Sequence, residues 1–566
     1  MLLHIDSVSV SPKIGESLLD IVRNNGLDSD KLSQMPLAAK IAGEIFNLNY
    51  VPVRNGDTTA DPSTMRRAMA ASDGEIHLIR YSDQAGKDVY MRTTQFVLFL
   101  ALHRLWPTYR AKMNCTVGQA LYIELPADCP FNVDTLRGEI KRIIHEDFPL
   151  IRKHMTTQEA IRKFESEGQS DKAALLRWRK AQNFSFYTCD DFADYYYGEL
   201  APSTGYVKTW EILPIQGGFL FLYPDDKNPD QIVAYSNLPK LLSVSTEGER
   251  WCELMGCENV SDLNRLVESD KIRELIRVNE ALHEKRFSQV ADMICDRGVK
   301  AVMVAGPSSS GKTTSANRLA TQLRVHGKKP ILISLDDFYV DRDKIPVDAE
   351  GKQDFEHINT IDTHLFRHTV KDLIRGEEVR LPTYNFLTGK REWHDHVLKM
   401  TEDTVIITEG LHALNPQMFP TSLDPSLMFK LFVSPILPLN LDDHNRIPSS
   451  LLRLLRRTVR DYETRGASVQ KTISMWDSVR AGEERWIFPY QESSDVHLNS
   501  ATLYELAVLK KHIFPLLAEV PPEDAAYDRV RSLVKILNYV LEADVDDEIP
   551  PTSLVREFIG GNSFYR

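Results

Sequence analysis

Gly306-Pro307-Ser308-Ser309-Ser310-Gly311-Lys312-Thr313-Thr314 matches the pattern G-x-x-x-x-G-K-[ST] of a phosphate-binding loop. The uncharged residues 301–305 before it predict a buried parallel strand, and residues 314–326 after it predict a helix that ends at Gly327. Glycines let the backbone wrap closely around a polyphosphate, and N–H groups at the start of the helix face it. A plain glycine- and serine-rich turn is the alternative, but the strand and the helix on its two sides favour a nucleoside triphosphate site.

The side chains of the loop predict how a nucleotide is held. Lys312 is expected to reach the β- and γ-phosphates, and the hydroxyl of Thr313 is expected to ligand Mg²⁺. The other loop positions that we expect to line the nucleotide site are Gly306, Ser308, Ser309, Ser310, Gly311 and Thr314. ATP and Mg²⁺ are therefore the expected cofactors.

The length and charge of the chain limit its class. With 566 residues it is too long for one hydrophobic core, and three or four domains are expected. Its net charge of −12 argues against a protein that coats nucleic acids, although a local basic patch is compatible with it. No apolar run approaches the ~18 residues that span a bilayer, and the apolar residues 96–102 predict a buried helix.

Targeting signals and cysteines indicate the compartment. The N-terminus lacks a basic segment followed by a long apolar segment, so no signal peptide is expected. The six cysteines form no C-x-x-C pair, which is typical of reduced thiols. A cytoplasmic protein without a membrane segment is therefore expected.

Acidic residues follow two further buried strands downstream of the loop. Residues 331–335 end at Asp336 and Asp337, and residues 404–408 end at Glu409. Carboxylates at the C-terminal ends of strands lie where open α/β sheets bind ligands. Such an acid accepts a proton from an attacking hydroxyl or holds Mg²⁺ through water, and Glu409 stands where the second of these roles is usual. A helix N-cap or a turn is the alternative, and it explains one aspartate more easily than two.

A basic helix is predicted after another strand at residues 429–433. Its arginines are Arg453, Arg456, Arg457, Arg460 and Arg465, and Gly466 follows them. Arginines three and four positions apart share one face of a helix. Such a face is usually solvated, but after a phosphate loop it favours a lid that neutralises charge on the transferred phosphoryl group.

The order of these motifs resembles the uridine kinase/phosphoribulokinase family over roughly residues 298–500. The five motifs are D-x-F-Y at 336–339, F-D-H at 355–357 with Glu for Asp, P-x-Y-D-F at 382–386 with Asn for Asp, E-G at 409–410, and R-R-x-x-R-D-x-x-x-R-G at 456–466. The resemblance implies that Asp336 is the catalytic base. It also implies catalytic roles for Lys312, Arg457 and Arg460, nucleotide binding by Arg465, and acceptor binding by Tyr339, Phe355, Glu356, Tyr384 and Arg457.

The acceptor pocket that this resemblance implies departs at three positions. Uridine–cytidine kinases have a histidine where this chain has Gly389, an arginine where it has Ala467, and a glutamine near Met475. A site built to hydrogen-bond a base discriminates strongly, so the loss of three polar groups changes what is bound. Transfer of the γ-phosphate of ATP to a sugar or nucleoside hydroxyl is thus better supported than uridine as the acceptor.

Residues 1–235 resemble the N-terminal part of threonyl-tRNA synthetases. Residues 38–48 are similar to the second half of their ubiquitin-like TGS domain, and residues 146–150, 157–164 and 192–205 are similar to their next domain. In that family an H-x-x-x-H helix and a C-x-x-x-H motif form an editing site with metal-ligand chemistry. Here the four positions are Met91, Gln95, Tyr196 and Leu200, none of which is a usual zinc ligand. We expect that the fold is kept and the hydrolytic site is lost.

The expected fold class is α/β, with a C-terminal phosphate-loop kinase domain built on a parallel sheet and preceded by two α+β domains. The expected domains are a TGS-like domain at 1–60, a synthetase-like domain at 61–235, a helical connector at 236–297 and a kinase-like domain at 298–566. Asn55-Gly56-Asp57 and Asp61-Pro62-Ser63 indicate the linker at the first boundary. Helices are expected over residues 263–278 and 281–295 of the connector.

Three functions remain open. The leading one is an ATP-dependent kinase for a small-molecule acceptor, which the acid at Asp336 favours. The second is an RNA- or ribosome-associated ATPase whose N-terminal half contacts RNA, with the tyrosines at 195–197 stacked on a base or, alternatively, buried in a core. The third is a protein that binds ATP without turnover. The N-terminal half is equally compatible with small-molecule binding or with a dimerisation scaffold in a homo-oligomer.

Overall fold

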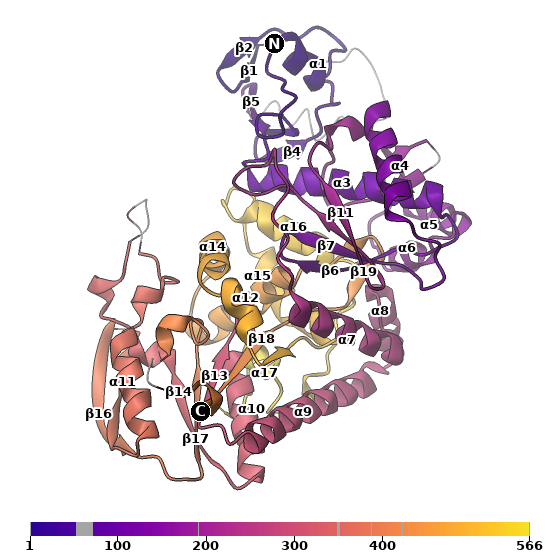
Figure 1. Cartoon of the computed structure of the whole chain (residues 1–566). Helices are drawn as coiled ribbons and strands as arrows, with labels where there is room; N and C mark the ends of the chain where they lie inside the picture. Colours follow the sequence, from indigo (N-terminus) through magenta and orange to yellow (C-terminus); the bar gives the residue numbers. More distant parts are fainter. Residues whose placement is uncertain are drawn as a thin grey trace. The chain divides into compact units, whose positions relative to one another are not determined.

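The computed structural model describes residues 2–52, 72–190, 192–347, 351, 353–386, 388–419 and 423–564. The chain divides into two compact units, which are described separately (Figure 1). Unit 1 comprises Met1–Asn237, Asn259–Ser261 and Asn440–Arg446, and unit 2 comprises Leu238–Glu258, Asp262–Leu439 and Ile447–Arg566. The predicted linker around residues 55–63 lies outside the described residues. Among those residues, no helix combines the length and the apolarity that crossing a bilayer requires.

Unit 1 begins with a small mixed sheet and one helix. Its strands are β1 (Leu3–Ile5), β2 (Val8–Val10), β3 (Ala38–Ile41), β4 (Glu44–Phe46) and β5 (Glu75–Ile79), in the order β2-β1-β5-β3-β4. Helix α1 (Leu18–Asn24) starts where the Ser17 side chain accepts the Asp20 N–H, which satisfies a free donor of the first turn. Strand β5 pairs with β1 and with β3, so this sheet takes its central strand from beyond the boundary predicted at residue 60.

The rest of unit 1 surrounds the long helix α3 (Gln84–Leu105). Residues 96–102 of this helix are almost completely buried, which confirms the buried helix predicted from the apolar run. A four-stranded sheet contains β6 (Lys112–Val117), β7 (Ala120–Glu124), β11 (Glu211–Ile215) and β12 (Gly218–Leu222), and a three-stranded sheet contains β8 (Ile151–Thr156), β9 (Asn183–Cys189) and β10 (Phe192–Asp194). Three further helices are α4 (Val133–Glu146), α5 (Thr157–Ser166) and α6 (Ser170–Leu176).

A buried ion pair in unit 1 joins α6 to β10. The Lys172 ammonium and the Asp194 carboxylate lie 2.6 Å apart, and both side chains are fully buried. The imidazole of His444, from the β19 (Asn440–Asp442) and β20 (Asn445–Arg446) hairpin, lies 2.6 Å from the same carboxylate and stacks on Phe99. Burial opposes ionisation of Asp194, but Lys172 and His444 outweigh it and lower its pKa to about 2. Each buried charge of the pair is therefore compensated by another side chain of the protein.

The positions that correspond to the synthetase editing site have other contacts. Gln95 donates to the Tyr223 hydroxyl at 3.1 Å, the Tyr196 hydroxyl donates to Asp194 at 3.4 Å, and Leu200 is fully buried. Within the described part of the chain, no group of three His, Cys, Asp or Glu side chains is placed to hold a metal ion. These side chains pack as structural residues.

Unit 2 is built on one parallel sheet, as predicted (Figure 1). Its strands are β13 (Ala301–Ala305), β14 (Lys329–Ser334), β17 (Thr404–Glu409), β18 (Met428–Ser434) and β21 (Val496–Asn499), in the order β14-β17-β13-β18-β21. Strand β13 is buried on both faces, as expected for the centre of a parallel sheet covered on both sides. Helix α10 (Lys312–Val325) follows β13 and packs against α9 (Ile272–Asp296). All five C-terminal strand ends therefore meet at one edge.

The helices before the sheet differ from the prediction. They are α7 (Pro239–Met255), α8 (Val260–Glu268) and α9, so the predicted helix over 263–278 is wrong and the chain breaks near Asp270, which has a φ of 57°. Helix α9 continues through the polar positions at which we placed a boundary. Asn279 accepts the Leu503 N–H at 3.1 Å and Glu280 accepts the Tyr504 hydroxyl at 2.7 Å. These partners allow polar side chains to be buried within one helix.

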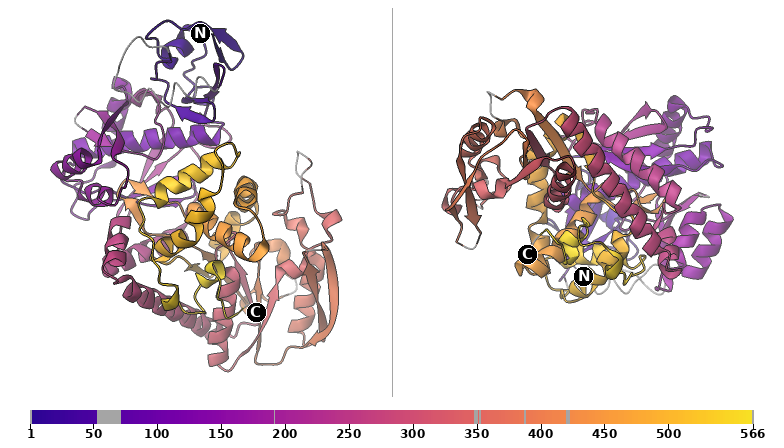
Figure 2. Two further views of the ribbon diagram at one scale, coloured as in Figure 1. Left: turned by 180° about the vertical axis from the view of Figure 1, so that it is seen from behind. Right: turned by 90° about the horizontal axis from the view of Figure 1, so that it is seen from below.

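The remaining elements of unit 2 lie outside this sheet (Figure 2). They are α11 (Thr363–Ile374), β15 (Val379–Asn385), β16 (Lys390–Leu398), α12 (Ser449–Arg465), α13 (Val469–Ser474), α14 (Trp476–Trp486), α15 (Glu505–Ala518), α16 (Tyr527–Leu537) and α17 (Arg556–Ile559). The C-terminal helices α15 and α17, yellow in Figure 2, pack against α12. The end of the chain thereby becomes part of the surroundings of the phosphate loop.

Candidate active site

The phosphate loop connects β13 to α10 with little free space. A Cβ atom at Gly306 would lie 2.0 Å from the Val433 carbonyl oxygen, so only glycine is accommodated there. Gly311 has a φ of 84° and immediately precedes α10. The hydroxyls of Ser309 and Ser310 are buried and lack a hydrogen-bond partner among the described residues. Buried hydroxyls without partners are costly unless a ligand supplies them, so the loop fits a polar, anionic group.

Two acids stand together at the ends of β14 and β17. Ser334 and Glu409 are directly paired in the sheet, and the Ser334 hydroxyl donates to the Glu409 carboxylate at 3.1 Å. Asp336 follows in the short 3₁₀ helix Leu335–Phe338 and is exposed. Its neighbour Asp337 instead accepts the Tyr384 N–H at 3.4 Å. The structure thus separates the roles of the two adjacent aspartates.

Electrostatics couples these acids to the loop lysine. Burial and the nearby Asp336 raise the pKa of Glu409 to about 7, although Lys312 opposes the increase. Partial desolvation by the surrounding protein raises the pKa of Asp336, while Lys312, Arg465 and Arg460 oppose the increase. Burial lowers the pKa of Lys312, and Glu409 and Asp336 oppose this. The two carboxylates and the half-buried ammonium of Lys312 therefore interact electrostatically with one another.

The oxygen donors at this edge fit a magnesium ion. Mg²⁺ prefers hard oxygen ligands and usually retains several waters. The hydroxyl of Thr313 and the carboxylate of Glu409 are such ligands. Burial and the charge of the nearby Asp336 raise the pKa of Glu409, and a cation would compensate that negative charge. These are the two residues for which the sequence predicted metal contact.

Helix α12 divides its arginines between two roles. The Arg453 guanidinium forms a buried ion pair with Glu483, and that of Arg456 forms a fully buried one with Glu505 at 2.7 Å. Arg453 also donates to the Ser308 carbonyl at 3.2 Å. These two arginines are therefore buried supports that hydrogen-bond to carbonyls of the phosphate loop, and including them in the predicted lid is wrong.

The other arginines of α12 are placed nearer to the acids. Arg457 donates to the Ser308 hydroxyl at 2.8 Å. Arg460 and Arg465 lie 2.8 and 3.5 Å from the Asp461 carboxylate, and both lower the pKa of Asp336. Arg457 thus touches the loop directly, while Arg460 and Arg465 act on the acid that faces it.

Aromatic rings and one half-buried acid, Glu356, form the predicted acceptor side. The Tyr339 ring packs 5.4 Å from that of Tyr384, and burial together with Asp336 and Glu356 raises the pKa of Tyr339 well above its ordinary value. Burial and Glu483 raise the pKa of Glu356 to about 7. One Glu356 oxygen, Oε2, has no hydrogen-bond partner among the described residues. Tyr339 therefore connects the acid near the loop to the acid of the acceptor side.

Two predicted acceptor positions are less enclosed. The side chain of Phe355 is 43% exposed. Gly389 has a φ of 69°, and a Cβ atom there would lie 2.9 Å from the Arg342 side chain. A histidine at this position would therefore be strained by its backbone and would clash, which is consistent with the departure from the pyrimidine-reading motif.

Sequence reasoning missed three polar residues near the loop. Glu483 accepts the Ser308 N–H at 2.9 Å, and Glu557 accepts the Thr314 hydroxyl at 2.6 Å. His412 is buried, and burial lowers its pKa to about 4. Only Leu411 separates His412 from the quoted motif Glu409-Gly410, whereas no pattern marks the two glutamates.

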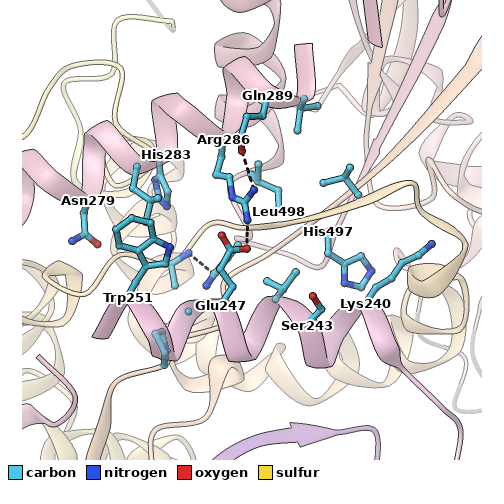
Figure 3. Close-up of a pocket in the computed structure, with 18 of the residues that line it drawn as sticks. Lys240, Ser243, Glu247, Trp251, Asn279, His283, Arg286, Gln289, His497 and Leu498 are labelled. Carbon is cyan, nitrogen blue, oxygen red and sulfur yellow. Dashed lines mark hydrogen bonds and ion pairs between the residues drawn. The ribbon is translucent and has the colours of Figure 1, made fainter. Parts of the chain in front are cut away.

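A cavity lies between α7 and α9 and is lined by none of the predicted site residues. Its volume is about 750 Å³. Glu247 and Arg286 point toward each other across it and form an ion pair, with Trp251 and His283 at one end and Lys240 at the other (Figure 3). The phosphate loop and the acids of β14 and β17 therefore define the candidate site, and this cavity is separate from them.

Comparison with known proteins identifies relatives of both parts of the chain. The family model described as "Phosphoribulokinase / Uridine kinase family" matches residues 301–506 of this chain. A uridine kinase of Aliivibrio salmonicida is 31% identical over 221 residues, which cover 38% of this chain and 94% of that protein. A uridine kinase of Ligilactobacillus salivarius is 30% identical over 194 residues, which cover 34% of this chain and 81% of that protein.

The other similarity is to aminoacyl-tRNA ligases. A threonine–tRNA ligase of Acetivibrio thermocellus is 29% identical over 192 residues, which cover 33% of this chain and 27% of the ligase. The chain therefore spans about a quarter of the length of the ligases that it matches. Similarity of this extent concerns one segment of those enzymes and not their complete catalytic apparatus.

Proposed function

The chain belongs to the Phosphoribulokinase / Uridine kinase family and joins its kinase part to a threonyl-tRNA ligase-like part, and on this basis we propose that it transfers the γ-phosphate of ATP to a hydroxyl of a nucleoside or related small molecule. The observation that carries the proposal is the placement of Lys312, Asp336 and Glu409 at the C-terminal ends of three neighbouring strands of one parallel sheet, β13, β14 and β17. An acid beside the phosphate loop is what hydroxyl activation requires.

Each residue has a definite task in this reaction. Asp336 accepts the proton of the acceptor hydroxyl while the oxygen forms its bond to the γ-phosphorus. The bond from that phosphorus to the β–γ bridging oxygen breaks, and ADP leaves. Lys312 and the loop N–H groups hold the phosphates, and Arg457, Arg460 and Arg465 neutralise charge as it develops.

Thr313 and Glu409 are the residues that would hold Mg²⁺, Glu409 through water. Bound Mg²⁺ supplies positive charge that offsets the negative charge on the β- and γ-phosphates. Ionised Glu409 is required for this task, and its raised pKa makes the task dependent on pH near 7.

We propose an acceptor other than uridine. Gly389, Ala467 and Met475 provide no strong side-chain hydrogen bond to a pyrimidine edge. The residues that remain on the acceptor side are aromatic rings and Glu356, and a carboxylate suits the hydroxyls of a sugar or polyol better than it suits one base. Tyr339, Tyr384 and Glu356 are therefore assigned to acceptor binding in this proposal.

A second candidate function is an RNA-associated ATPase. The similarity of one part of the chain to threonine–tRNA ligases supports RNA contact by unit 1. In this case ATP hydrolysis would report on RNA binding and would not require an organic acceptor. Tyr195 is only 2% exposed, so its ring is not available to stack on a base. Fewer of the tyrosines at 195–197 could therefore contact RNA than the sequence alone suggests.

One assay distinguishes these functions. ADP release by the full chain is measured with ATP and Mg²⁺ alone, and then with nucleosides, sugars and sugar phosphates, polyols, or tRNA. A kinase consumes ATP in step with formation of a phosphorylated acceptor, whereas an RNA-associated ATPase is stimulated by tRNA and releases inorganic phosphate. ATP consumption that no organic acceptor stimulates would contradict the kinase proposal.

A further inference from the structure

The C-terminal segment places a carboxylate on the phosphate loop. Glu557 in α17 accepts hydrogen bonds from the Thr314 N–H at 3.3 Å and from the Thr314 hydroxyl at 2.6 Å. The Asn562 amide donates to the same hydroxyl at 3.4 Å. Glu557 lies beyond residue 506, at which the family match ends, so this contact is an addition to the matched kinase fold.

Thr314 belongs to the part of the loop that receives phosphate groups. It is the third residue of α10, and the first N–H groups of a helix have no partner within the helix and attract anions. Lys312 reaches the β- and γ-phosphates of a nucleotide on such a loop, so donors further along the helix are left for the α-phosphate. The Glu557 carboxylate therefore occupies the donors that the α-phosphate would use.

The segment that carries Glu557 is firmly packed. Leu554, Val555 and Phe558 are fully buried, and the Phe558 ring lies 4.8 Å from the Arg456 guanidinium carbon. A Cβ atom at Gly311 would lie 3.2 Å from the Leu554 side chain. The backbone of α17 is thus held against the loop, whereas the half-buried Glu557 side chain can leave Thr314 by a change of rotamer.

We propose that Glu557 competes with the α-phosphate of the nucleotide and thereby sets the affinity of the site for ATP and ADP. A nucleotide binds when the Glu557 side chain rotates away from Thr314. The Glu557 carboxylate and the α-phosphate do not bind the Thr314 donors at the same time, because like charges at contact distance repel strongly where water is partly excluded. The inference rests on the proposed function, since it requires that the loop binds a nucleotide.

The test compares ADP, which has an α-phosphate, with pyrophosphate, which can bind without placing a phosphate in the α position. The full chain, Glu557→Gln and Glu557→Asp are titrated calorimetrically with Mg²⁺–ADP and with Mg²⁺–pyrophosphate, which can occupy the β and γ positions alone. Glu523→Gln is the matched control, because it removes the same charge from an exposed residue of the C-terminal segment. Melting temperatures confirm that each variant is folded.

We expect Glu557→Gln to bind ADP at least about tenfold more tightly than the unmodified chain. Pyrophosphate affinity should change by less than about twofold, Glu557→Asp should be intermediate for ADP, and Glu523→Gln should match the unmodified chain. Unchanged or weaker ADP binding by Glu557→Gln, with pyrophosphate still bound, would overturn the inference and leave the proposed function intact. If neither ligand binds any of the proteins, the inference and the proposed function both fail.

Discussion

The backbone N–H of Ser308 donates a hydrogen bond to the Glu483 carboxylate at 2.9 Å, and α14 is thereby joined directly to the phosphate loop. Glu483 is fully buried and also pairs with Arg453 of α12 and with Arg480, the latter at 3.1 Å. One carboxylate thus connects two helices to the loop before any phosphate is bound.

Glu483→Gln should lower the free energy of unfolding by about 3–5 kcal/mol, because it leaves the buried Arg453 guanidinium without its counter-charge. Denaturant unfolding measures the change. The matched control is Glu484→Gln, which removes a largely exposed partner of Arg480 and should cost about 0–1 kcal/mol. Equal effects of the two substitutions would show that the buried network has no special role.

Lys312→Ala should weaken ATP binding and abolish turnover, since it removes the positive charge placed at the β- and γ-phosphates. Calorimetric titration with ATP and a coupled ADP-release assay measure the two effects. Lys329→Ala, on an exposed residue at the start of β14, is the control and should leave both unchanged. Unaltered ATP affinity and turnover in Lys312→Ala would refute the assignment of the loop.

Asp336→Asn should reduce the phosphoryl-transfer rate by roughly 10²–10⁴ while ATP affinity stays nearly the same, because it removes only the proton acceptor. Asp337→Asn is the matched comparison. Its new amide oxygen still accepts the Tyr384 N–H that Asp337 accepts at 3.4 Å, so we expect a much smaller effect. If Asp337→Asn were inactive and Asp336→Asn active, the base would be misassigned by one residue.

Glu409→Gln should stabilise the protein at pH 8.5 and have little effect at pH 5. Burial and the neighbouring Asp336 raise the pKa of Glu409 to about 7, above the value near 4.5 of the unfolded chain. The stability that this group contributes is therefore complete below pH 4.5 and is lost as the pH rises through 7, because a buried carboxylate then becomes charged.

The expected gain from Glu409→Gln at pH 8.5 is about 1–3 kcal/mol in the free energy of unfolding without Mg²⁺. Urea unfolding of both proteins at the two pH values measures it. The same variant should lose Mg²⁺-dependent turnover, since an amide is a poorer partner for the metal. Stability curves that run parallel from pH 5 to pH 8.5 would contradict the raised pKa.

Uridine and cytidine should be poor acceptors. Three absent hydrogen bonds to a buried base, at Gly389, Ala467 and Met475, cost about 1–3 kcal/mol each and together lower kcat/KM by several powers of ten. Steady-state kinetics with the acceptor panel measures this. Gly389→His should not restore uridine phosphorylation, because its φ of 69° and the contact with Arg342 disfavour a side chain there. Efficient turnover of uridine would show that other residues read the base.

The sequence by itself determined the core of the kinase part. The strand, loop and helix at residues 301–325 are contiguous, so their hydrogen bonds and backbone preferences are encoded locally. Asp336 and Glu409 were also predictable, because strands in a parallel sheet end at the same edge and an acid that follows such a strand must lie there.

Only the tertiary structure decided which charged residues face the loop. Ser308 and Glu483 are 175 residues apart in the chain, and Thr314 and Glu557 are 243 apart, so neither contact leaves a pattern in the sequence. Arg453 and Arg457 share one helix and similar spacing, yet packing buries the first against Glu483 and presents the second to Ser308. Helix α9 continues through Asn279 and Glu280 for the same reason: their partners at Leu503 and Tyr504 come from a distant segment, and local propensity contains no information about them.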